Sequence, residues 1–379
     1  MDLVRIIHEE APDRNVVVAP LSVSLTFAAL LDSSPDTKTN HEITSAFHWN
    51  ETSNLNDASR MLLARFEKPK PPPPQSSSSS KKQSAEDLQY LRSGKPAESW
   101  ISGAFLFRGE GSLSQNFINR VKYNFGFEFR AVGIHSSQSE VLARNWDPSL
   151  PMPEVTGDND FWITSFTHLR TSWAGNTFVG AKREKHDFRL QSGSIVQADF
   201  LKSENNVYPY ARTDDFEAIV LSCWQASILL VMPPQGRDIS QLESAIADDP
   251  QMIESLLKRS VGDVQLPPFH FIYSSDLRDP LEKMGVRGIF SSNPNDLLFM
   301  VPGKGGVLRG VTQKSDITVD EEGIRADAGT IFHGIYGGIM APPPTPFHLV
   351  LNRPFIFIIR DTVTNALLFA GVVMNPVLP

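Results

Sequence analysis

Two apolar runs lie close to the end of the chain, Asn352-Arg353-Pro354-Phe355-Ile356-Phe357-Ile358-Ile359-Arg360 and Leu368-Phe369-Ala370-Gly371-Val372-Val373-Met374-Asn375-Pro376. Both are rich in β-branched and aromatic residues, which strands favour. Neither alternates between apolar and polar residues, so each strand would be buried on both faces. We therefore predict two core strands, at 355–360 and 367–374.

Further strand-like runs occupy most of the second half of the chain, at 102–107, 161–169, 216–223, 226–232, 264–273 and 307–319. Helical patterns cluster before them, at 22–31, 39–48, 56–66 and 115–123, and recur at 239–258 and 275–284. The first of these helices follows Pro20 and is apolar on nearly all sides, as a buried helix is. Early helices followed by long strands predict an α+β fold with antiparallel sheets.

The composition of the 379 residues limits the class of protein. Hydrophobic residues make up 41% and charged residues 21%, so the chain can bury a sizeable core and is not disordered as a whole. The net charge of −8 argues against nucleic-acid binding. The single cysteine, Cys223, excludes an internal disulfide and a cysteine-based zinc site. No run predicts a transmembrane helix, and residues 1–5 lack the pattern of a signal peptide.

The sequence contains no complete catalytic motif among those we searched for. His41-Glu42-Ile43-Thr44-Ser45 begins like the helix of a zinc protease, but Ser45 stands where the second histidine is needed. Gly303-Lys304-Gly305-Gly306 lacks the spacing of a phosphate-binding loop, and no Gly-x-Ser-x-Gly nucleophile motif occurs. We therefore expect neither an enzyme nor a bound cofactor or metal.

The segment 68–84 has a composition that folded cores do not use. A proline-rich run, 68–74, is followed by five serines at 76–80 and by Lys81-Lys82. Proline favours extended chain without hydrogen bonds and serine buries little apolar surface, so we predict a disordered surface insertion. Recruitment of a partner through the proline run is an alternative.

The segment 321–346 is longer than a loop that merely connects two elements of a compact domain, which indicates that it has a function. It also carries a strand-like alternation. One side would hold Ile324, Ala326, Ala328, Thr330 and Phe332, and the other Arg325, Asp327, Gly329 and His333, with Ile331 out of step. This pattern predicts a loop that can become a strand, with its small residues against a core and both charges in solvent.

These residues, together with others along the chain, resemble the serpin family. The two C-terminal runs are similar to its most specific signature, and Asn15-Val16-Val17-Val18-Ala19-Pro20-Leu21-Ser22 resembles the entry to its second helix. Leu266-Pro267-Pro268-Phe269 with Met284-Gly285-Val286 resembles its middle part. The resemblance implies a single serpin domain over 1–379, with helices packed around three mostly antiparallel β-sheets and an exposed reactive-centre loop at 321–346.

Serpins that inhibit proteases offer this loop as bait. The target protease attacks the bait bond and forms an acyl-enzyme, and the cut loop then inserts as a strand of the main sheet. The resemblance therefore implies a suicide-substrate inhibitor of serine or cysteine endopeptidases. Its partner is the target endopeptidase, held as a covalent acyl complex, and it acts as a monomer without nucleic acid or membrane. The family favours an extracellular or secreted location. The alternative is a non-inhibitory serpin that acts as a carrier, chaperone or storage protein.

The hinge of inhibitory serpins is similar to Glu321-Glu322-Gly323-Ile324-Arg325-Ala326-Asp327-Ala328-Gly329-Thr330. Ile324 replaces an expected threonine, and Asp327 departs from the small-residue rule but falls on the solvent side of the alternation. The resemblance also implies that Trp173, Ser22, Ser165 and Gln313 belong to the region where the main sheet opens. Ser165 stands where an asparagine is frequent in the family, and Gln313 where a histidine is common. The polar cluster that controls sheet opening would therefore have a different composition here.

Counting the family's usual spacing from Glu321 puts the bait bond between Gly337 and Gly338. The loop beyond that bond is longer than usual, so cleavage after Tyr336 or between Met340 and Ala341 is an alternative. No lysine or arginine occurs between Arg325 and Arg353. A trypsin-like target, whose pocket needs a basic side chain, therefore fits poorly, and an elastase-, subtilisin- or chymotrypsin-like target fits better.

Overall fold

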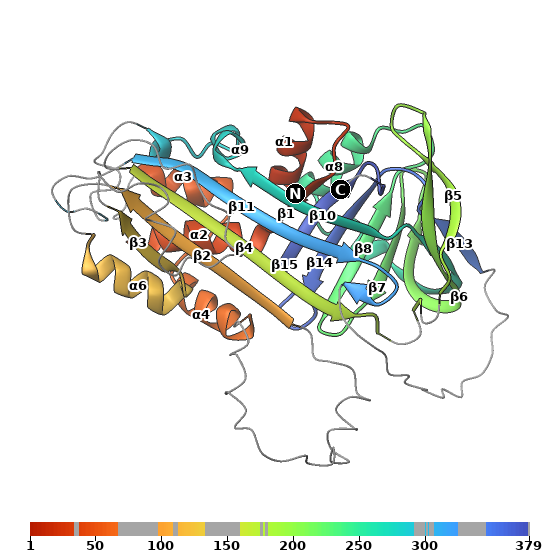
Figure 1. The fold of residues 1–379 in the computed structure, drawn as a ribbon, viewed down its shortest axis with the longest axis horizontal. Helices are drawn as coiled ribbons and strands as arrows, with labels where there is room; N and C mark the ends of the chain where they lie inside the picture. Colours follow the sequence, from red (N-terminus) through yellow and green to blue (C-terminus); the bar gives the residue numbers. More distant parts are fainter. Residues whose placement is uncertain are drawn as a thin grey trace, which may run out of the picture.

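The strands of the computed structural model form two sheets, and helices lie behind the smaller of them (Figure 1). The structure describes residues 1–33, 38–66, 98–108, 113–132, 160–174, 177–178, 181–291, 300, 302, 307–324 and 346–377. Within these ranges the sequence of elements is the expected α+β arrangement, with most of the helices before most of the strands.

The smaller sheet has six strands in the order β10-β11-β4-β2-β3, and β12 pairs with β4 beside this path. Its strands are β10 (Phe269–Asp276), β11 (Val307–Val319), β4 (Asp160–Ser172), β2 (Glu98–Arg108), β3 (Glu128–Val132) and β12 (Gly323–Ile324). The pairs β10·β11, β2·β4 and β12·β4 are antiparallel, whereas β11·β4 and β2·β3 are parallel.

The larger sheet has nine strands in the order β1-β15-β14-β8-β7-β6-β9-β13, with β5 paired to β6. Its strands are β1 (Val16–Val18), β15 (Leu367–Val373), β14 (Phe355–Asp361), β8 (Ala226–Met232), β7 (Glu217–Ser222), β6 (Ile195–Arg212), β9 (Lys258–Leu266), β13 (Phe347–Val350) and β5 (Glu184–Arg189). Three sheets were expected. The described strands form two, because β6 is 18 residues long and pairs with both β9 and β7.

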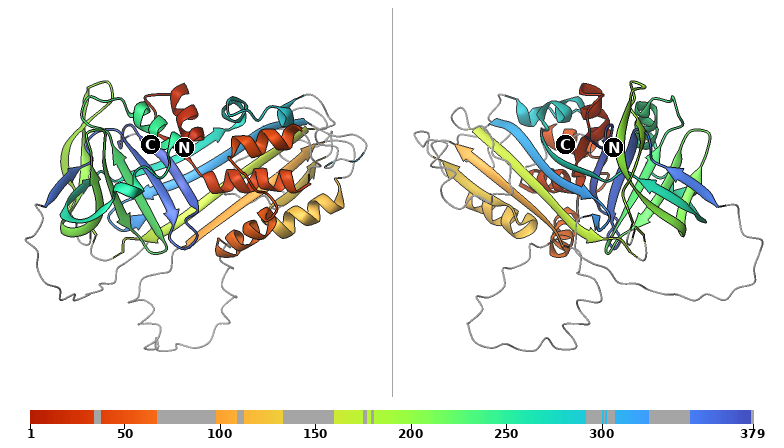
Figure 2. Two further views of the ribbon diagram at one scale, coloured as in Figure 1. Left: turned by 180° about the vertical axis from the view of Figure 1, so that it is seen from behind. Right: turned by 45° about the vertical axis from the view of Figure 1, so that its right-hand side comes forward.

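Seven α-helices are described: α1 (Asp2–Glu10), α2 (Pro20–Ser33), α3 (Lys38–Ala46), α4 (Leu55–Arg65), α6 (Gln115–Phe125), α8 (Ile239–Asp248) and α9 (Arg278–Lys283). Two 3₁₀ turns, Glu254–Leu256 and Gly288–Phe290, complete the helical elements of these ranges. Seen from behind in the left view of Figure 2, α2 and α3 lie across the back of the six-stranded sheet. None of the described helices is both long and apolar enough to cross a membrane.

The two C-terminal strands lie where their apolar sequence predicted, in the core between the sheets. Phe355 and Phe357 of β14 are fully buried. The ring of Phe269, from β10 of the other sheet, lies 6.2 Å from Phe355 and 5.4 Å from Phe357 between centroids. These aromatic contacts join the two sheets and hold the smaller one against the larger.

Prolines explain two corrections to the predicted elements. The single strand expected at 264–273 is wrong: Pro267-Pro268 interrupts it, β9 joins the larger sheet and β10 the smaller. Proline has no N–H for the ladder, so a strand ends there. The helix expected at 239–258 ends at Asp248, just before Pro250, and a strand begins at Lys258. The helix expected at 275–284 begins only at Arg278, because β10 continues to Asp276.

Candidate functional site

The parallel pairing of β4 with β11 stops before β4 ends. It runs from Asp160–Val307 to Thr167–Ser315, and the last five residues of β4 lie beyond it. At the far end of β4, Ser172 and Thr171 pair antiparallel with Gly323 and Ile324 of β12. Residues 168–170 of β4 therefore lie between two pairings, one with β11 and one with β12.

A tight turn joins β11 to β12. The N–H of Asp320 donates to the carbonyl of Gly323 at 2.9 Å, and the N–H of Gly323 donates to the carbonyl of Asp320 at 3.3 Å. The Asp320 carboxylate accepts the N–H of Glu322 at 2.9 Å, as aspartate does in turns. The turn reverses the chain, so that Gly323 and Ile324 run antiparallel to β4 as the start of a new strand.

Gly323 fits a backbone position that other residues cannot easily take. Its φ is +137°, outside the range that side chains favour. A Cβ atom there would lie 2.6 Å from the Cα of Ser172 and would also meet the carbonyl oxygen of Thr171. The close approach of β12 to β4 therefore requires glycine at this position.

Trp173 donates two hydrogen bonds to the turn. Its indole Nε1 donates to the Asp320 carbonyl at 2.8 Å, and its backbone N–H donates to the Glu322 carbonyl at 3.4 Å. The indole is 6% exposed and meets the ring of Phe178 edge-on at 5.4 Å between centroids. Cys223, whose backbone pairs with that of Trp173, is buried, and this burial raises the pKa of its thiol, which disfavours the reactive thiolate.

Arg183 forms an ion pair with the turn on its solvent-exposed side. Its guanidinium Nη2 lies 2.7 Å from Oε2 of Glu321, and both side chains are partly exposed. Partial burial opposes ionisation of Glu321, but the hydrogen bond and charge of Arg183 outweigh it and lower the pKa of the carboxyl. Glu321 is therefore ionised at neutral pH and paired. Nothing in the sequence pointed to Arg183, since a lone arginine before a strand can have many roles.

Three of the expected sheet-opening residues, Ser22, Ser165 and Gln313, lie near one another, whereas Trp173 follows the far end of β4, eight residues beyond Ser165. Ser165 Oγ on β4 donates to Ser22 Oγ at 3.4 Å, and Ser22 on α2 donates to the Ala19 carbonyl at 3.0 Å. Gln313 is the β11 partner of Ser165, yet its Nε2 donates to Ser315 Oγ at 2.7 Å. Its Oε1 is buried with no hydrogen-bond partner among the described residues. Ser315, fully buried, is the member of this cluster that the sequence did not single out.

Several expected site residues fall outside the described part of the chain. These are the rest of the hinge (Arg325, Ala326, Asp327, Ala328, Gly329 and Thr330) and the bait-bond candidates (Tyr336, Gly337, Gly338, Met340 and Ala341). The segment 68–84 also lies outside it.

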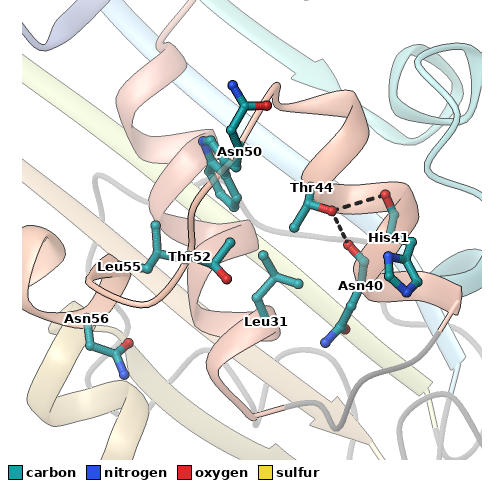
Figure 3. Close-up of a pocket in the computed structure, with 9 residues that line it drawn as sticks. Leu31, Asn40, His41, Thr44, Asn50, Thr52, Leu55 and Asn56 are labelled. Carbon is teal, nitrogen blue, oxygen red and sulfur yellow. Dashed lines mark hydrogen bonds between the residues drawn. The ribbon is translucent and has the colours of Figure 1, made fainter.

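A separate cavity of about 450 Å³ lies among α2, α3 and α4 (Figure 3). Its lining holds no carboxylate, lysine or arginine: Leu31, Asn40, His41, Thr44, Trp49, Asn50, Thr52, Leu55 and Asn56. The hydroxyl of Thr44 donates to the carbonyls of Asn40 and His41. The lining contains no carboxylate to act with His41, and no group of three metal-ligating side chains occurs within the described residues.

Comparisons with known proteins agree on one family. The family model for serpins, described as serine protease inhibitors, matches residues 1–376. Serpin-Z7 of barley is 24% identical over 303 residues, which is 74% of each chain, and human Serpin A12 is 22% identical over 379 residues, covering 97% of this chain and 83% of its own.

Solved structures agree on the fold. Arabidopsis AtSerpin1, in its native stressed conformation, has a TM-score of 0.79 at 17% identity, covering all of this chain and 96% of its own. Human thyroxine-binding globulin with its ligand has a TM-score of 0.76 at 20% identity, covering 99% of this chain and 95% of its own.

Proposed function

Because the chain belongs to the serpin family, we propose that it is a suicide-substrate inhibitor of serine endopeptidases. Residues 321–346 act as its reactive-centre loop, with the bait bond at Gly337–Gly338, and the whole chain works as one domain with 68–84 as a surface insertion. The target has elastase-, subtilisin- or chymotrypsin-like specificity, since no lysine or arginine lies between Arg325 and Arg353.

The observation that carries this proposal is the pairing of Gly323 and Ile324 with Ser172 and Thr171 of β4. β12 is the first part of a strand beside β4. It can lengthen if the residues after Ile324 pair with β4 in the same register. Continuation brings Ala326 opposite Leu169, Ala328 opposite Thr167 and Thr330 opposite Ser165.

This register fits the alternation of the loop. Leu169, Thr167 and Ser165 are all at most 5% exposed and lie on the face of β4 toward the core. Arg325 and Asp327 come opposite Arg170 and His168, which are only half-buried and lie on the other face. Small residues thus meet the packed face and charged residues the more open one, as insertion requires.

The chemistry of trapping follows from these parts. The protease nucleophile attacks the Gly337 carbonyl, the peptide bond to Gly338 breaks, the amine of Gly338 leaves with a proton, and an ester joins Gly337 to the protease. Insertion of about 14 residues at ~3.3 Å each then carries the ester on the order of 45 Å along the sheet. Hydrolysis of the ester fails if this movement distorts the protease before water attacks.

A non-inhibitory role as a carrier or storage protein is the second candidate. Asp327 is the departure from the small-residue hinge that supports it, although in the proposed register this side chain meets the more open face of β4. A carrier would be cut at the loop without trapping the protease.

Incubation with pancreatic elastase, chymotrypsin and subtilisin, followed by denaturing gel electrophoresis and mass spectrometry, tests the proposal. An inhibitor gives a complex that resists detergent and a free C-terminal peptide that begins at Gly338. A carrier gives only the nicked chain. Loop cleavage should also raise the melting temperature strongly if the loop inserts, and leave it unchanged if it does not.

A further inference from the structure

A buried pair of ionisable side chains joins the N-terminal helix to α8. His8 lies in the last turn of α1 and is 4% exposed, and Glu243 lies on α8 and is 1% exposed. Nδ1 of His8 is 2.8 Å from Oε2 of Glu243, and Nε2 of His8 is 3.0 Å from the carbonyl oxygen of Pro12. Figure 1 shows α1 and α8 side by side near the two chain ends.

The contacts of His8 fix the number of protons that the pair holds. The Pro12 carbonyl can only accept, so Nε2 of His8 carries a proton and donates it. The short contact between Nδ1 and the Glu243 carboxyl needs a second proton between them, on either atom. With that second proton lost, the Nδ1 lone pair would face a buried carboxylate, and the contact would become repulsive.

Other groups around the pair make the second proton harder to remove. Oε1 of Glu243 is buried with no hydrogen-bond partner among the described residues, so a full negative charge there would be poorly solvated. The other charges that act on the pair are acidic: Asp238, which caps α8, and Glu9 of α1. Burial opposes a charge on His8, but Glu243 outweighs it and raises the pKa of His8, while burial raises the pKa of Glu243.

The other ionisable groups at α1 are exposed ion pairs and the amino group of Met1, whose pKa burial lowers, so that its titration would stabilise the helix as the pH rises. Lys283 of α9 pairs with Glu10, His48 lies 3.3 Å from Asp2, and Arg5 pairs with Glu9 within α1. The strands β1 and β15 present only apolar residues and glycine. His8 and Glu243 are therefore the one buried titratable pair at this helix within the described residues.

We propose that His8 and Glu243 form a proton-dependent clasp, which holds α1 against α8 while the shared proton is present and loosens α1 as the pH rises. The folded pair keeps its shared proton to a higher pH than His8 does in the unfolded chain, so folding takes up one proton here. The stabilisation is complete below the ordinary histidine pKa of about 6.5 and is lost as the pH rises through the higher pKa of folded His8.

Amide hydrogen exchange of the full chain, measured by mass spectrometry from about pH 6 to about pH 9, tests the clasp. After correction for intrinsic exchange, protection of 1–11 should fall with rising pH, by at most about tenfold per pH unit because one proton is released. In Glu243→Gln the protection should be lower at acidic pH and nearly independent of pH. Two controls should keep the wild-type profile: Glu10→Gln, which removes an exposed ion pair of the same helix, and His48→Gln, which removes the other histidine near it.

A flat wild-type profile, or a Glu243→Gln variant that keeps the wild-type slope, overturns the clasp. So does a His48→Gln variant that loses the slope, because His48 would then be the titrating group. If Glu243→Gln does not fold, the ring resonances of His8 in the wild-type protein decide by NMR. Their midpoint should lie above the ordinary histidine value, and a midpoint below it contradicts the proposal.

Discussion

The Arg183 guanidinium lies 2.7 Å from the Glu321 carboxylate, and this ion pair ties the first residue of the hinge to the chain just before β5. Trp173 holds the preceding residue, Asp320, through its indole N–H at 2.8 Å. Two contacts therefore fix the turn before β12: the solvent-exposed ion pair of Arg183 with Glu321, and the hydrogen bond from the buried Trp173 ring to Asp320. The two contacts differ in strength, because the ion pair is open to solvent.

Arg183→Gln should therefore have a small effect on stability, a loss of about 1 kcal/mol or less at neutral pH. The pKa of Glu321 is lowered in the folded state, so the contribution of the pair is present above the ordinary glutamate pKa of about 4.3 and is lost as the pH falls through the lower folded value. Urea unfolding at neutral and acidic pH measures this. Arg189→Gln is the control, since the Arg189 guanidinium donates to the carbonyl of Gly193 and forms no ion pair with another described residue. Equal losses in both variants would contradict a specific role for the pair.

Gly323→Ala should unpair β12 from β4. The added Cβ meets Ser172 and Thr171 and the residue must keep a positive φ, at a cost of about 1–3 kcal/mol. Amide exchange at 171–173 should become faster, and fewer protease molecules should be trapped per serpin molecule consumed. Gly193→Ala is the matched control, because Gly193 also has a positive φ (+86°) but nothing within 4 Å of its Cβ position. Unchanged exchange in Gly323→Ala would show that the approach of β12 tolerates a side chain.

The register of insertion gives a prediction with its own control. Ala326→Glu should abolish the detergent-resistant complex and leave a cleaved serpin, because the carboxylate would face Leu169 in the core. Arg325→Glu should keep the complex, since it meets Arg170 on the opposite face and replaces a like charge by an opposite one. Denaturing gels with elastase or chymotrypsin separate the two outcomes. Loss of the complex in both variants, or in Arg325→Glu alone, would falsify the register.

The sequence predicted best those elements whose pattern depends on burial alone. The bounds of β8 and β11 match their predicted ranges, and the strands at the C-terminus differ by one residue. β8, β14 and β15 are largely apolar, and most of β11 alternates between buried and half-buried residues, so period and length suffice to locate them. The break at Pro267-Pro268 was missed because the flanking residues are strand-like on both sides, and only the sheet each half joins reveals two strands.

The candidate site was predicted in part, for a different reason. The alternation after Glu321 indicated a strand, and Gly323 and Ile324 do pair with β4. Arg183 and Ser315 were not found, because their roles depend on which distant residue lies opposite them. Gln313 illustrates this: its place beside Ser165 was expected, but its hydrogen bond to Ser315 is set by the rotamer and not by the register.

A buried carboxylate at the end of β14 should make the fold sensitive to acid. Asp361 is 2% exposed and accepts Nε and Nη2 of Arg65 at 3.0 and 2.8 Å, as well as the N–H of Thr364 at 2.7 Å. Burial alone would raise the pKa of Asp361, but these hydrogen bonds outweigh burial and lower it. The stabilisation is therefore present above the ordinary aspartate pKa of about 3.9 and is lost as the pH falls through the lower folded value.

Asp361→Asn should cost about 3 kcal/mol at neutral pH, because Arg65 on α4 loses its charge partner. Its free energy of unfolding should also vary less with pH in the acidic range than that of the wild type. Asp57→Asn, which removes the exposed ion pair with Arg60 on the same helix, should cost less than about 1 kcal/mol. Urea titrations from neutral to acidic pH compare the three proteins, and a wild-type acid slope that persists in Asp361→Asn would assign the slope to another carboxylate.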